Sequence, residues 1–112
     1  MSTVDLIARI AATPETFDRL RRLLEDYAQT VRDEPGNLRF ELYASREDHG
    51  LVVVERYEDD RAFEQHCRSP ENARFNRALQ SLLGGRGSAL EMLTRLDAQH
   101  GTGNATGDLP SS

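Results

Sequence analysis

Apolar residues recur along the chain with two different periods. Four segments carry the two-residue period or the short apolar run of a strand, and they are residues 4–11, 38–45, 51–57 and 89–96. Elsewhere apolar residues recur three or four positions apart, as on one face of an amphipathic helix. This second pattern follows Thr13-Pro14-Glu15 and Ser69-Pro70-Glu71, each of which offers a capping hydroxyl, a proline and an early carboxylate. Two helices are therefore predicted to begin there.

The ends of the helices are also marked in the sequence. Glu34-Pro35-Gly36 stops the first helix, and Gly84-Gly85 supplies the left-handed residue that commonly follows the last turn of a helix. A short helix capped by Asp59-Asp60 precedes the second long one and carries Phe63 and His66. The second helix is thus predicted to be broken into a short and a long piece.

The order strand, helix, strand, strand, broken helix, strand predicts an α+β domain with the ferredoxin-like β-α-β-β-α-β arrangement. Such a domain has a four-stranded antiparallel sheet with both helices on one face. Val52, Val53 and Val54 make both faces of the third strand apolar, so something must also cover the second face. We expect that face to pack against the same face of a second copy, which makes the protein a homodimer.

Composition limits the domain organisation and the partners. We expect one domain in residues 1–98 and a disordered tail in residues 99–112, which are rich in Gly, Thr, Asn and Ser. The net charge of -5 comes from interspersed residues, so no nucleic-acid partner is expected. No apolar run is long enough to span a bilayer, and Cys67 is the only cysteine, so we expect a cytoplasmic protein without a membrane partner.

Glu55 is the first candidate for chemistry. It shares the parity of Val53 and Tyr57, so its carboxylate is expected to point toward the helices, an unusual place for glutamate. Burial disfavours the charged carboxylate, and His66, three residues after Phe63 on the short helix, could exchange a proton with it. Two interpretations stay open: a catalytic acid-base pair, or a pair whose hydrogen bonds merely hold the helix on the sheet.

Several aromatic or large apolar residues fall on the stripes that face the space between sheet and helices. They predict an aromatic-rich cavity for a small-molecule substrate, although each taken alone also suits core packing. The substrate-binding candidates are Tyr27, Phe40, Phe63, Phe75 and Leu79, and Tyr57 is a further candidate beside them. No flavin, nicotinamide or metal-binding motif is present, so we expect neither a cofactor nor a bound metal.

Four short motifs in this order resemble the antibiotic-biosynthesis-monooxygenase family over residues 4–96. The motifs are Glu34-Pro35-Gly36, Arg39-Phe40-Glu41-Leu42-Tyr43, Val54-Glu55-Arg56-Tyr57 and Ala62-Phe63-Glu64-Gln65-His66. The resemblance implies a dimeric α+β barrel. Within that fold we expect His66 or Glu55 to act as the base and Tyr57 to orient the substrate. Haem-degrading relatives carry a ligating histidine at the position that matches Leu79 of this chain, so the resemblance does not imply haem.

Three functions follow from these observations. The leading hypothesis is a cofactor-independent monooxygenase that acts on a small aromatic, quinol or polyketide-like substrate, whose own electrons would reduce oxygen. The second is a proton-transfer isomerase or cyclase that uses the same residues without oxygen. The third is a non-catalytic dimeric module that binds a small ligand, which a cavity filled with side chains would favour.

Overall fold

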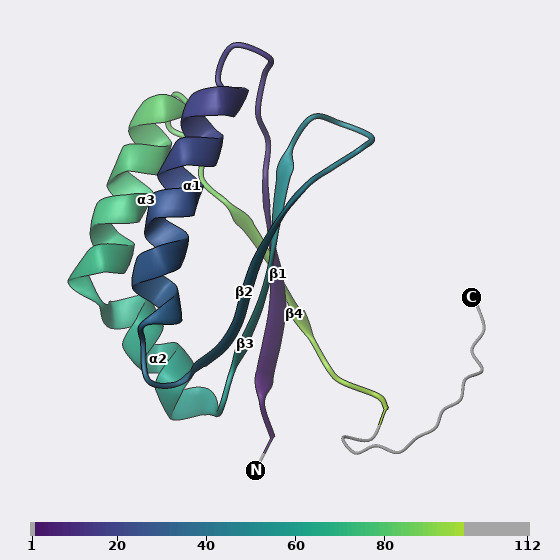
Figure 1. Cartoon of the computed structure of the whole chain (residues 1–112), viewed down its shortest axis with the longest axis vertical. Helices are drawn as coiled ribbons and strands as arrows, with labels where there is room; N and C mark the ends of the chain where they lie inside the picture. The colour runs from purple at the N-terminus through teal and green to yellow at the C-terminus, as the bar shows by residue number, and fades with distance from the viewer. Residues whose placement is uncertain (1, 98–112) are drawn as a thin grey trace.

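The computed structural model describes residues 2–97, and the predicted tail at residues 99–112 lies outside that part (Figure 1). The elements in chain order are β1 (Val4–Ile10), α1 (Phe17–Arg32), β2 (Asn37–Ala44), β3 (Leu51–Tyr57), α2 (Asp60–Arg68), α3 (Pro70–Leu82) and β4 (Ala89–Leu93). The helices lie together on one face of the sheet, with α1 and α3 side by side (Figure 1).

The four strands form one sheet in the order β2-β3-β1-β4, and all three neighbouring pairs are antiparallel. The predicted α+β class and its ferredoxin-like order are therefore confirmed. Glu55 of β3 stands opposite Leu6 on one side and Phe40 on the other, in the middle of the helix-covered face. Sheet topology thus carries an acidic side chain into the space between the two layers.

The predicted start of the first helix at Thr13 is wrong by about one turn. Residues 13–16 form a separate turn in which the amides of Thr16 and Phe17 both donate to the Thr13 carbonyl at 3.0 Å. The Thr13 hydroxyl is bonded to Thr16 within that turn, so it does not cap α1, which begins at Phe17. The hydrogen bonds between Thr13 and Thr16 thus compete with an extension of α1 toward its N-terminus.

The other predicted caps are confirmed. Asp59 accepts a hydrogen bond from the Ala62 amide at 2.8 Å, and Ser69 accepts one from the Asn72 amide at 3.0 Å. Gly84 has φ of +67°, as expected for the residue that follows a helix. The fourth strand ends at Leu93, three residues before its predicted end, because its pairing with β1 stops there.

The core lies between the sheet and the inner faces of α1 and α3. Leu20, Leu24, Ala28 and Val31, which follow the helical period, are buried from α1. Leu79 of α3 is buried completely in the same cluster. Burial of these side chains against the sheet supplies the main hydrophobic stabilisation of the domain.

We propose that the uncovered face of the sheet pairs with the same face of a second copy. Val52 and Val54 are only half-buried there, and Leu93 of β4 is exposed. Asp5 and Arg56 form an ion pair at 2.5 Å on this face, so apolar residues and matched charges alternate across it. Such a mixture is suited to a self-complementary interface around a twofold axis.

Light scattering of the full chain at micromolar concentration is expected to give twice the chain mass of 12.6 kDa. Val54→Lys should shift the mass toward one chain, because dimerisation would then bury an added ammonium from each copy in the interface. Arg61→Ala, on the exposed side of α2, should leave the dimer intact. A wild-type mass of one chain would contradict the proposed dimer.

Candidate functional site

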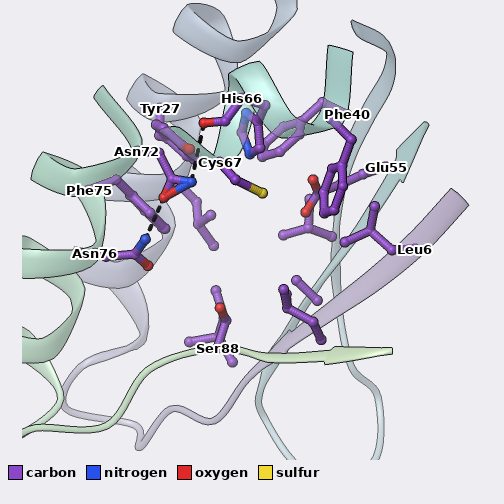
Figure 2. A pocket seen from close by; sticks show the side chains of 16 residues that line it. Leu6, Tyr27, Phe40, Glu55, His66, Cys67, Asn72, Phe75, Asn76 and Ser88 are labelled. Atoms are coloured by element: carbon purple, nitrogen blue, oxygen red, sulfur yellow. Dashed lines mark hydrogen bonds between the residues drawn. The ribbon is translucent and has the colours of Figure 1, made fainter. Parts of the chain in front are cut away.

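A cavity of about 90 Å³ lies between the sheet and the helices. Figure 2 shows Tyr27 and Phe75 on one side of it and Phe40 and Glu55 on the other. Tyr27 and Phe75 stack face to face with ring centroids 4.1 Å apart. Phe63 also lines the cavity. Four of the predicted substrate-binding residues are thus brought together around one space, whose wall is mainly aromatic and apolar.

Two of the predicted residues do not line this cavity. Leu79 belongs to the hydrophobic core, where it is fully buried among the residues of α1 and the sheet. Tyr57 is also fully buried, in a smaller cluster with Val4 and Leu6 near the other end of the sheet. Tertiary packing covers both side chains, so neither Leu79 nor Tyr57 borders the cavity in this structure.

Glu55 reaches the cavity from the middle of β3 and is 6% exposed. The Tyr57 hydroxyl, two residues along the same strand face, donates to its Oε1 at 2.7 Å. Burial raises the pKa of the Glu55 carboxyl above its ordinary value. The hydrogen bond from Tyr57 and the nearby His66 favour the charged form and lower this pKa, but the effect of burial is larger. A carboxyl group of this kind is suited to hold a proton and to return it.

His66 reaches the same cavity from α2 and is also 6% exposed. Its Nδ1 lies 3.0 Å and 3.2 Å from the two carboxylate oxygens of Glu34. Its ring also packs on that of Tyr57, with centroids 4.9 Å apart. Within residues 2–97 no hydrogen bond joins His66 to Glu55, so the two residues share the cavity but each has a different partner.

Glu34 is a functional candidate that the sequence does not reveal, since the Glu34-Pro35-Gly36 motif indicates only a helix end and a family resemblance. The turn after α1 packs tightly on the start of α2. The two segments are so close at Gly36 that a Cβ atom there would overlap the Cβ of Ala62. The Glu58 amide donates to the Gly36 carbonyl at 2.9 Å and ties this turn to the end of β3. This close approach brings Glu34 opposite His66.

Further polar residues border the cavity that the sequence did not single out. Asn72 donates to the His66 carbonyl at 3.4 Å, and Asn76 donates to the Asn72 side chain (Figure 2). Cys67 directs its sulfur into the cavity, and Ser88 borders it near the start of β4. Asn72 and Asn76 stand four residues apart on α3, a spacing that places two amides on one helix face and could have indicated them.

The raised pKa of Glu55 predicts a pH dependence of stability. The folded state binds the Glu55 proton more tightly than the unfolded state, so stability falls as pH rises from 4.5 through the raised pKa. Glu55→Gln should lack this decline, because the amide keeps an acceptor for Tyr57 but cannot ionise. Urea unfolding at several pH values measures the difference, with the exposed Glu64→Gln as control. Identical pH courses for wild type and Glu55→Gln would contradict the prediction.

The described part of the chain has neither a cluster of metal-ligating side chains nor a membrane-spanning helix. No three His, Cys, Asp or Glu side chains of residues 2–97 come together in a way that could hold a metal ion. None of the described helices is long and apolar enough to cross a membrane.

Comparisons with known proteins agree with this architecture. Rv0793 of Mycobacterium tuberculosis is 33% identical over 96 residues, which cover 86% of this chain and 94% of that protein. Its solved structure matches with a TM-score of 0.78, over 87% of this chain and 98% of that one. PA3566 of Pseudomonas aeruginosa is 31% identical, with a TM-score of 0.75 over 87% and 97% of the two chains.

A Deinococcus radiodurans protein with a TM-score of 0.78 covers 89% of this chain and 99% of its own, and at 22% identity it supports the fold alone. The model of the family described as antibiotic biosynthesis monooxygenase matches residues 3–78, from the start of β1 into α3. With that match and the similarity to Rv0793, this chain belongs to the antibiotic biosynthesis monooxygenase family.

Proposed function

We propose that the protein is a cofactor-independent monooxygenase for a small, electron-rich aromatic substrate of the quinol or polyketide type. The observation that carries this proposal is the convergence of Glu55 and His66 on one aromatic-walled cavity in a member of a monooxygenase family. An imidazole and a carboxyl group of raised pKa, both largely buried, form a suitable pair for proton transfer.

The reaction that suits these groups begins with loss of a proton from the substrate. For an activated aromatic methylene, His66 accepts the proton and the resulting anion gives its electrons to oxygen. The hydroperoxide that forms then loses water, so that CH₂ and O₂ become C=O and H₂O. The substrate supplies all the electrons, which accords with the lack of flavin and nicotinamide motifs in the sequence. The protein supplies the base, the position of the substrate and exclusion of water.

The size of the cavity adds a requirement. A cavity of about 150 Å³ is known to hold benzene, whereas this one measures about 90 Å³, so a substituted ring has to widen it. Leu90 borders the cavity and is 56% exposed, so the cavity meets solvent beside β4. The nearby connection from α3 contains Gly84, Gly85 and Gly87, around which there is open space. We therefore place substrate entry beside Leu90, where the wall is least constrained.

Oxygen uptake with a panel of anthrones and hydroquinones tests the proposal. We expect the wild-type protein, without added cofactor, to consume one oxygen molecule for each substrate molecule converted. Conversion of a panel member without oxygen uptake would contradict the proposal and favour the isomerase or cyclase. Tight binding without any conversion would contradict it in favour of a ligand-binding module.

A further inference from the structure

We propose that Glu34 is a positioning residue that fixes the tautomer of His66. In this arrangement the ring proton sits on Nδ1, and Nε2 is left as the proton acceptor of the cavity. The role of Glu34 in turnover rests on the proposed function, but the tautomer is a property of the resting protein. The inference therefore has a test of its own.

The first support is the position of His66 between two hollows. On one side is the cavity with Glu55, and on the other is an outer groove of about 240 Å³ that is bordered by Glu34, Gly36 and Ala62. His66 borders both hollows, whereas Glu34 borders only the groove and Glu55 only the cavity. The ring is therefore the link between the Glu34 carboxylate and the space proposed for the substrate.

The second support is the chemistry of the contact. An ionised carboxylate only accepts hydrogen bonds, so a short contact of Nδ1 with both oxygens of Glu34 requires the proton to be on Nδ1. In the neutral ring Nε2 is then an acceptor. No hydrogen bond to Nε2 is found among the described residues, so this nitrogen is free to take a substrate proton.

The third support is electrostatic. The side chain of Glu34 is 23% exposed, which leaves it hydrated on the groove side, yet its negative charge contributes to raising the pKa of Glu55 and of Cys67. Its field therefore reaches the groups that border the cavity. The same charge would stabilise the positive ring that forms when His66 takes a proton, as a carboxylate does behind a catalytic histidine.

Other ionisable groups surround the ring, but none replaces Glu34 in this contact. They are Tyr27 of α1, Glu55 and Tyr57 of β3, Cys67 of α2, and Asp33 and Glu71, which border the outer groove. Within residues 2–97 none of them forms a hydrogen bond with the His66 ring. The tautomer of His66 is thus assigned to a single partner.

The ¹⁵N chemical shifts of His66 in the full chain, recorded where the ring is neutral, test this directly. We expect wild type to carry the proton on Nδ1, and Glu34→Ala to move the population toward the Nε2-protonated form that free histidine prefers. Glu34→Asp should retain part of the Nδ1-protonated form. Glu71→Gln, on the same groove, should leave the shifts unchanged. A wild-type proton on Nε2, or an unchanged tautomer in Glu34→Ala, would overturn the inference.

Activity separates this inference from the proposed function. With a true substrate, Glu34→Ala should lower kcat and leave KM little changed, because Glu34 does not border the cavity. An Nδ1-protonated His66 in a protein without oxygenase activity would refute the proposed function and leave the positioning role intact. Full activity in Glu34→Ala would refute the role of Glu34 in turnover while leaving the oxygenase standing.

Discussion

Replacing His66 with alanine is expected to reduce oxygen-consuming turnover by about 10²–10⁴-fold, the usual contribution of a positioned acid or base. The reason is that His66 is the imidazole that borders the cavity and has Nδ1 already bound to Glu34. The fold should survive, because Ala62 and the caps at Asp59 and Ser69 still anchor α2.

The control for this variant is Gln65→Ala, which alters the adjacent, exposed residue of α2 that borders the outer groove and not the cavity. Its turnover should match that of wild type. If His66 is purely structural, His66→Ala should instead lose about 1–3 kcal/mol of stability, the cost of an unsatisfied partner. Unchanged turnover in a well-folded His66→Ala would remove this residue from the mechanism.

Leu79→Ala is expected to lower the free energy of unfolding by about 2–5 kcal/mol, as for other large-to-small changes in a core. Leu79 is 0% exposed and lies in the main cluster between α1, α3 and the sheet. Urea unfolding measures the loss. Leu38→Ala is the matched control, since Leu38 is an exposed leucine of β2 and its truncation should change stability by no more than about 0.5 kcal/mol.

The outcome for Leu79 also decides between two roles that the sequence left open for it. A side chain in the core affects stability first, whereas one in the cavity affects ligand affinity first. A loss below about 1 kcal/mol together with weaker ligand binding would contradict its assignment to the core.

The element order and the direction of Glu55 were predictable from the sequence because both depend on local periodicity. Alternation along β3 assigns Glu55 to the face of Val53, and the sheet register then determines its neighbours. The caps at Asp59 and Ser69 were predictable for the same reason, since each acts within three residues of itself. The turn that Thr13 and Thr16 form is equally local, but two threonines bonded to each other left no cap for the helix.

The cavity was only partly predictable because periodicity cannot show how deeply a side chain lies. Tyr57 follows the parity of Glu55 and still lies outside the cavity, since it packs against Val4 and Leu6 at the end of the sheet. Leu79 follows the helical stripe of Phe75 one turn away, and the core covers it. Facing the layer between sheet and helices is thus not the same as bordering the space within it.

Glu34 could not be paired with His66 from the sequence. The two are 32 residues apart, and their contact depends on the close packing of Gly36 against Ala62. Glycine was interpreted as a helix stop, which is its local role. Gly36 also lets the turn after α1 approach α2 closely, and this second role can be recognised only from the three-dimensional structure.

The most direct test of the central claim is to follow the oxygen atoms. With ¹⁸O₂ in ordinary water and a panel substrate that the wild-type protein converts, mass spectrometry of the product should show one ¹⁸O atom per molecule. His66→Ala should form this labelled product at the reduced rate given above. A product that gains no ¹⁸O while wild type turns over would show that no atom of O₂ is inserted into the substrate, and the monooxygenase account would be wrong.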